Sequence, residues 1–215
     1  GHARKGNTAR CQHWYDQMVA AEVQPNTQIF STLLNGCAAA GNTTLMEEWF
    51  SRMKDVGIKV DLVTYNTLLK GYSRKGDTTR CKQWFDEMIA GSLKPNVRTF
   101  NTLLDGCVTA GDTALLEEWF GSMKDSGVRG DLVTYNTLLK GYSRRGDMVQ
   151  CERYYEQMLA AGLQPDVQTF STLLEGCFVA GDALLMEDWF SRMQAVGIRA
   201  NEVTFQILHK EVPRR

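Results

Sequence analysis

The chain repeats itself every 35 residues, and this period constrains its fold more than any other feature. Glycine, leucine and methionine each recur at that step, in three series: Gly36, Gly71, Gly106, Gly141 and Gly176; Leu33, Leu68, Leu103, Leu138 and Leu173; Met53, Met88, Met123, Met158 and Met193. A period of this length is typical of proteins in which similar structural units stack on one another.

The period divides the chain into five full repeats and two partial ones. The full repeats are residues 27–61, 62–96, 97–131, 132–166 and 167–201; residues 1–26 match the later part of a repeat, and residues 202–215 begin another. The stretch LVTYNTLLKGYSR occurs at 62–74 and again at 132–144, so alternate repeats are the closest relatives. We predict a single array over residues 1–215.

Each repeat is predicted to form two helices. In the second repeat, one apolar helix face has the spacing i, i+3, i+4, i+7: Tyr65, Leu68, Leu69 and Tyr72. Gly76 interrupts that pattern, and a second apolar stripe begins at Cys81. Because one helix pair cannot bury its own stripe, neighbouring pairs must stack. The predicted fold class is all-α, a right-handed α-α superhelix (α-solenoid) of helix-turn-helix repeats, with first helices on one surface and second helices on the other.

Local signals at the helix ends support this assignment. An Asn or Asp precedes each second helix as a predicted N-cap: Asn42, Asp77, Asp112, Asp147 and Asp182. Glycines with positive φ are predicted where second helices end, at Gly57, Gly127, Gly162 and Gly197.

Composition and charge argue against several other classes. The chain is 43% hydrophobic and 23% charged with a net charge of −1, as in an ordinary globular protein, and no apolar run is long enough for a membrane span. The six cysteines lack CxxC spacing, so we interpret them as buried residues in a reducing compartment, with disulfides or a metal as alternatives. The three histidines pair with no recurring nucleophile or carboxylate. We therefore expect no enzyme activity and no cofactor or metal.

The face opposite the apolar core carries a second pattern. At 100° per residue, Val63, Asn66, Lys70 and Arg74 fall in one stripe, which the fourth repeat copies. Asparagine is a poor helix former, yet the fifth residue of each repeat is Asn or Ser: Ser31, Asn66, Asn101, Asn136 and Ser171. This residue is either a tolerated polar group or a hydrogen-bonding group for a molecule lying along the surface. An amide both donates and accepts, which reading a base edge requires.

The last residue of each repeat is restricted to Asp or Asn: Asp61, Asn96, Asp131, Asp166 and Asn201. An ordinary N-cap explains this restriction, and a role beside the fifth residue is compatible with it. Basic residues gather around the predicted first-helix surface, whereas many acidic ones fall on second helices. Such a stripe suits a phosphate backbone, although a solvated charged face is the alternative.

The repeat VTYNTLLKGYSRKGD…WFDEM…LKPN resembles the pentatricopeptide repeat (PPR) over essentially the whole chain. Tetratricopeptide repeats step by 34 and carry a W-LG-Y pattern that is absent here. The resemblance implies a solenoid that binds single-stranded RNA and reads one base per repeat. It also implies a mitochondrial or chloroplast protein that serves RNA processing, stability, editing or translation.

The resemblance also implies roles for individual residues. The base-reading pairs would be Ser31 with Asp61, Asn66 with Asn96, Asn101 with Asp131, Asn136 with Asp166, and Ser171 with Asn201. The resemblance implies the bases G, C (or U), U, U and A for these pairs, for a core 5′-GCUUA-3′. The base-stacking residues would be Val63, Arg98, Val133 and Val203. The phosphate-contacting residues would be Arg4, Lys70, Arg74, Lys75, Lys140, Arg144 and Arg145.

Two other functions stay open at this point. The odd repeats depart from the pattern, with Gln28, Arg98 and Gln168 where a small aliphatic residue is usual. Their weaker reading face is compatible with a protein-interaction scaffold within a mitochondrial ribosome or an RNA-processing complex. Residues 1–26 supply only a second helix, so a homodimer through exposed array ends is a further expectation.

Overall fold

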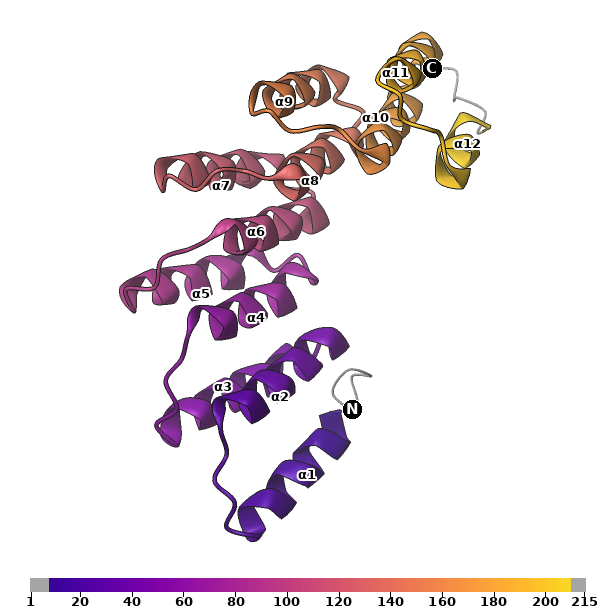
Figure 1. Cartoon of the computed structure of the whole chain (residues 1–215). Helices are drawn as coiled ribbons and strands as arrows, with labels where there is room; N and C mark the ends of the chain where they lie inside the picture. Colours follow the sequence, from indigo (N-terminus) through magenta and orange to yellow (C-terminus); the bar gives the residue numbers. More distant parts are fainter. Residues whose placement is uncertain (1–7, 210–215) are drawn as a thin grey trace. The chain divides into compact units, whose positions relative to one another are not determined.

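The structure, a computed structural model, describes residues 8–209, and their side chains from Cys11 onward. Within this range every regular element is an α-helix (Figure 1). The chain separates into two compact units, with the boundary in the sequence between Ala110 and Gly111, and each is described by itself. No helix within residues 8–209 is long and apolar enough to cross a membrane.

The described part of the N-terminal unit holds six helices: α1 (Thr8–Ala20), α2 (Thr27–Ala40), α3 (Thr43–Asp55), α4 (Leu62–Ser73), α5 (Thr78–Ala90) and α6 (Val97–Ala110). Helices α2 and α3 pack as the pair of the first repeat, and α4 and α5 as the pair of the second. The first helices α2, α4 and α6 also pack in a continuous row, which forms one surface of this unit.

The C-terminal unit has the same organisation: α7 (Thr113–Asp125), α8 (Leu132–Ser143), α9 (Met148–Ala160), α10 (Val167–Ala180), α11 (Ala183–Ala195) and α12 (Glu202–Leu208). Helices α8 and α9 form one pair and α10 and α11 the next, while α8, α10 and α12 pack in a row of first helices. The predicted all-α fold of stacked helix-turn-helix repeats is therefore confirmed.

The helix ends follow the sequence signals. At every second helix from α3 to α11 the predicted N-cap side chain accepts a backbone N–H from the third residue of the helix, at Asn42, Asp77, Asp112, Asp147 and Asp182. The four predicted glycines have φ between +69° and +77°, a region that L side chains rarely adopt: Gly57, Gly127, Gly162 and Gly197.

The core lies between the two helices of each pair and between successive pairs. In the second repeat Leu68, Leu69 and Met88 are fully buried, and burial of each such side chain contributes roughly 2 kcal/mol. Five of the six cysteines are buried as predicted, and Cys11 is half-buried. The recurring leucines and five of the six cysteines are thus core residues.

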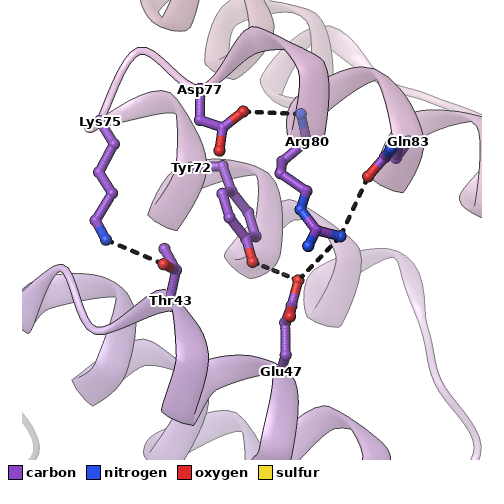
Figure 2. A network of polar contacts seen from close by, with 7 residues as sticks. All are labelled: Thr43, Glu47, Tyr72, Lys75, Asp77, Arg80 and Gln83. Atoms are coloured by element: carbon purple, nitrogen blue, oxygen red, sulfur yellow. Dashed lines mark hydrogen bonds and ion pairs between the residues drawn. The ribbon is translucent and has the colours of Figure 1, made fainter.

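A polar network joins the first two repeats across this core (Figure 2). The Tyr72 hydroxyl of α4 donates to Oε1 of Glu47 on α3, and the Arg80 guanidinium of α5 lies 3.6 Å from the same oxygen. The Lys75 ammonium donates to Oγ1 of Thr43 at 3.0 Å. One carboxylate therefore contacts both helices of the following repeat.

The C-terminal unit builds the equivalent network with different partners. Glu117 of α7 accepts the Tyr142 hydroxyl on Oε1 and the Tyr154 hydroxyl on Oε2. Burial, followed by the hydrogen bond and the charge of Glu117, raises the pKa of both phenols. The phenols therefore remain protonated donors to the carboxylate.

Candidate nucleic-acid interface

The first-helix surface exposes the second residue of several repeats. Val63, Val133 and Val203 are each more than half exposed although they are apolar, and Arg98 is exposed as well. Each lies at the N-terminal end of a first helix, about one turn before the fifth residue. The position predicted to stack on bases is thus available to a ligand.

The fifth residue is less exposed than the sequence pattern predicts. Asn66 is 8% exposed and Ser171 6%, so the expectation of a fully outward stripe is wrong at these positions. Close packing of the next first helix is the cause, because that helix brings a buried threonine against the fifth residue. Asn101, Asn136 and Ser31 are half-buried.

In the second repeat, one threonine joins the two predicted reading residues. Oγ1 of Thr99, on α6, lies 2.8 Å from Oδ1 of Asn66 and 3.1 Å from Oδ1 of Asn96. The backbone N–H of Thr99 donates to Oδ1 of Asn96 at 3.0 Å, so Asn96 is also the N-terminal cap of α6. The fifth and last residues therefore lie on either side of a single hydroxyl.

The fourth repeat has the same arrangement. Oγ1 of Thr169, on α10, lies 2.7 Å from Oδ1 of Asn136 and 2.9 Å from Oδ1 of Asp166, the N-cap of α10. In addition, Nδ2 of Asn136 donates to Oδ1 of Asp166 at 3.4 Å. The structure thus brings this predicted pair into direct contact.

These contacts determine which atoms remain for a ligand. Among the described residues, the Asn66 and Asn96 side chains form hydrogen bonds through their Oδ1 atoms alone. Neither Nδ2 atom is among the described side-chain atoms that are buried without a hydrogen-bond partner. The second repeat therefore offers two amide donors. The fourth offers a donor from Nδ2 of Asn136 and an acceptor from Oδ2 of Asp166, because the described residues engage that carboxylate through Oδ1 alone.

The other predicted pairs differ in their contacts. Ser171 lies 3.4 Å from Oγ1 of Thr204, which bonds Asn201 at 3.0 Å. Asp61 caps α4 through Thr64, but no hydrogen bond joins Thr64 to Ser31.

The remaining predicted pair is divided between the two compact units. Asn101 is half-buried on α6 of the N-terminal unit, and Asp131 caps α8 of the C-terminal unit.

A hollow of about 400 Å³ opens on the first-helix surface of the N-terminal unit. It lies between α2 and α4 and is lined by Gln28, Ser31, Thr32, Asn35, Gly36, Ala39 and Lys70. Four of the lining residues, Gln28, Ser31, Thr32 and Asn35, carry amide or hydroxyl side chains, and Lys70 is exposed at α4. The predicted reading residue of the first repeat therefore faces a space next to a cation.

Several predicted phosphate-contacting residues also have structural partners. Arg74 donates to the Ala38 carbonyl at 3.1 Å, and Lys75 donates to Thr43 in the preceding repeat. Arg145 donates to Thr113 at 2.8 Å. Lys70, Lys140 and Arg144 are exposed, and Arg4 lies outside the described residues.

The threonine at the third position of the repeat is the feature that the sequence reasoning missed. It recurs as Thr64, Thr99, Thr134, Thr169 and Thr204, and each is at most 1% exposed. A polar residue that recurs on the buried side of an amphipathic helix needs a hydrogen-bond partner, and this signal was present in the sequence.

Family models match most of the chain. The PPR repeat family matches residues 60–109, 99–141 and 130–179, which together exceed half of the chain. The pentatricopeptide repeat domain matches residues 15–75, and the PPR repeat matches residues 168–198. A search of curated protein sequences gives no significant match.

Solved structures agree with the family models. The crystal structure of the pentatricopeptide repeat protein PPR10 from maize aligns with a TM-score of 0.75 and 25% identity, over 96% of this chain and 30% of that one. PPR10 in complex with an 18-nt psaJ RNA element aligns at 0.68 and 23%, over 96% and 35%.

The PPR domain of Arabidopsis thaliana protein-only RNase P 1 in complex with tRNA aligns with a TM-score of 0.66 and 20% identity, over 81% of this chain and 92% of that one. The present chain spans about a third of the length of the PPR10 chains. From its repeats, its helix pairs and these matches, the chain belongs to the pentatricopeptide repeat family.

Proposed function

We propose that the chain binds single-stranded RNA with sequence selectivity, and that each repeat reads one base through its fifth and last residues. The observation that carries this proposal is the different pair of outward atoms in the second and fourth repeats. Their first thirteen residues are identical, so a difference in base preference must come from elsewhere in the repeat. The last residues, Asn96 and Asp166, supply that difference.

The outward atoms complement different pyrimidines. Cytosine presents two neighbouring acceptors, N3 and O2, and two amide donors match them in the second repeat. Uracil presents an N3–H donor next to carbonyl acceptors, and the donor of Asn136 with the acceptor of Asp166 matches that edge. This agrees with C at the second and U at the fourth nucleotide of 5′-GCUUA-3′.

The surroundings of the reading pairs support the proposal. Exposed valines at the second position offer apolar surface to the faces of unstacked bases, and the exposed Lys70 and Lys140 offer charge to phosphates. The solved complexes of PPR10 with an RNA element and of the RNase P 1 PPR domain with tRNA place RNA on proteins of the same fold. By family, we propose an organellar role in RNA processing, stability, editing or translation.

A reciprocal exchange of the last residues tests the proposal. Asn96→Asp is expected to shift the preference at the second nucleotide from C to U, and Asp166→Asn to shift the fourth from U to C. Both residues remain good N-caps after the exchange, so folding is preserved. Binding is measured by fluorescence anisotropy with 5′-GCUUA-3′ and its single-base variants, embedded in an unstructured RNA.

Two further results bear on the proposal. Four or five phosphate contacts predict a log–log salt dependence with a slope of roughly −3, at about −0.7 per contact for single strands. Unchanged base preferences in both exchange variants would refute the reading pairs. If a randomised RNA pool gives no enriched sequence at low salt, the protein-interaction scaffold is the better explanation.

A further inference from the structure

We infer that the third-position threonines Thr99 and Thr169 are positioning residues for base selection, because they fix which face of the fifth-residue amide meets the RNA. This inference rests on the proposed function. It adds a third residue, contributed by the following repeat, to the pair that reads each base.

The hydrogen-bond geometry around Thr169 determines the direction of each bond. Its Oγ1 accepts the backbone N–H of Asp166 at 3.1 Å, and its own proton has two acceptors within reach. Oδ1 of Asp166 already accepts the Thr169 N–H at 2.8 Å, whereas Oδ1 of Asn136 lies closest to the hydroxyl, at 2.7 Å. The hydroxyl proton therefore serves the Asn136 amide.

The opposite orientation of the Asn136 amide is unfavourable. Rotation by 180° would place Oδ1 of Asn136 where Nδ2 now lies, 3.4 Å from Oδ1 of Asp166. Two acceptors would then face each other, and the hydroxyl of Thr169 would lose its acceptor on Asn136. With Thr169 present, Asn136 presents an N–H donor to the ligand and keeps its oxygen turned away.

The same reasoning applies to the second repeat. Oγ1 of Thr99 accepts the Asn96 N–H at 3.2 Å and lies 2.8 Å from Oδ1 of Asn66. Thr99 is fully buried, so water does not replace its hydroxyl. Without this hydroxyl, the Asn66 amide would be free to turn either its oxygen or its nitrogen toward a base, and the donor pattern would be lost.

The first repeat provides a matched control. The Thr64 hydroxyl lies 2.8 Å from Oδ1 of its capping residue Asp61, as the Thr169 hydroxyl lies 2.9 Å from Oδ1 of Asp166, but it makes no hydrogen bond to Ser31. Thr64→Val therefore removes a hydroxyl–cap bond without touching a fifth residue. Thr169→Val removes the hydroxyl from beside both the capping residue Asp166 and the fifth residue Asn136, and Thr169→Ser keeps it.

The test measures the ratio of affinities for U and C at the fourth nucleotide. Thr169→Val is expected to lower this ratio roughly three- to tenfold, the factor that one ordinary hydrogen bond is worth. Thr169→Ser is expected to keep the ratio, and Thr64→Val to keep the preference at the first nucleotide. Thr99→Val repeats the test at the second nucleotide, and circular dichroism verifies that each variant is folded.

An RNA-free measurement separates this inference from the proposed function. The side-chain amide signals of Asn136 in ¹⁵N-resolved NMR spectra of the free protein are expected to shift in Thr169→Val and to stay in place in Thr64→Val. If the unaltered protein does not discriminate U from C, the proposed function fails, and the amide signals still decide whether Thr169 orients Asn136. Full discrimination in Thr169→Val together with unshifted Asn136 signals would overturn the inference.

Discussion

Replacing Glu117 with glutamine is expected to weaken the attachment of α7 to the following repeat. The side chain is almost isosteric, so packing is retained, but the negative charge that accepts two phenolic hydroxyls is lost. Tyr154 is 1% exposed and Tyr142 6%, so water compensates little at their hydroxyls. The substitution therefore tests whether charge-assisted hydrogen bonds hold consecutive repeats together.

The magnitude follows from the two contacts. A hydrogen bond to a charged group contributes about 1.5 kcal/mol at the lower end of its range, which suits the half-buried Glu117. Charge-assisted bonds are roughly twice as strong as neutral ones, so each contact loses about 0.75 kcal/mol in Glu117→Gln. We expect a destabilisation of roughly 1.5 kcal/mol, and a coupling energy of roughly 0.75 kcal/mol between Glu117→Gln and Tyr154→Phe.

Urea unfolding followed by circular dichroism measures these values for the single and double variants. Tyr135 supplies the matched control, because it is a buried tyrosine of the same unit whose hydroxyl makes no hydrogen bond within residues 8–209. Tyr135→Phe is expected to show no coupling to Glu117→Gln. Unfolding slopes must stay constant across the set, since long repeat arrays can lose two-state behaviour.

The reasoning would be refuted by a coupling energy below about 0.3 kcal/mol between Glu117 and Tyr154, no larger than that of the Tyr135 control. A value that small lies within the usual scatter of additive effects. The network would then be a consequence of packing and would contribute nothing of its own to stability.

Two more predictions concern backbone space and buried thiols. Gly162 and Gly146 both have a positive φ. Gly162→Ala is expected to lower the free energy of unfolding by about 1–2 kcal/mol, because the added Cβ strains the backbone but meets no other atom. Gly146→Ala is expected to lower it further in urea unfolding, because its Cβ would lie 2.9 Å from the Ala180 backbone nitrogen. Burial raises the pKa of Cys151 to about 12, above its ordinary value of 9.0, so this thiol should resist alkylation at pH 8 while the half-buried Cys11 reacts, as peptide mapping would show. Because the folded-state pKa is the higher one, the stability linked to Cys151 is intact below pH 9 and is lost as the pH rises toward 12.

Much of the fold could be predicted from the sequence because its determinants are local and repeated. The apolar spacing of Leu68 and Leu69 fixes a buried helix face, Asp77 satisfies the N–H groups at a helix start, and Gly127 allows the positive φ at a helix end. Each of these effects acts within a few residues, and the residues that cause it recur with little variation in the five full repeats.

The contacts between repeats were harder to predict. The 100° projection placed Asn66 outward, but the helix that covers it begins 31 residues later and brings Thr99 with it. Arg74 and Lys75 likewise look like free cations in the sequence, yet each donates a hydrogen bond to the preceding repeat. A single-helix projection contains no information on the neighbouring helix, so these partners require the packed structure.

The hydrogen bond from Thr99 to Asn66 changes where this chain can be cut for recombination. A module defined as residues 62–96 carries its fifth and last residues but leaves behind the threonine that orients them. Residues 27–61 carry Ile29 at the equivalent position, so placing them directly after residues 62–96 would set a side chain without a hydroxyl against the Asn66 amide. In engineered arrays built from this protein, module boundaries should therefore lie after the third residue of the following repeat. Each fifth-residue amide then stays in the same module as the threonine hydroxyl that orients it.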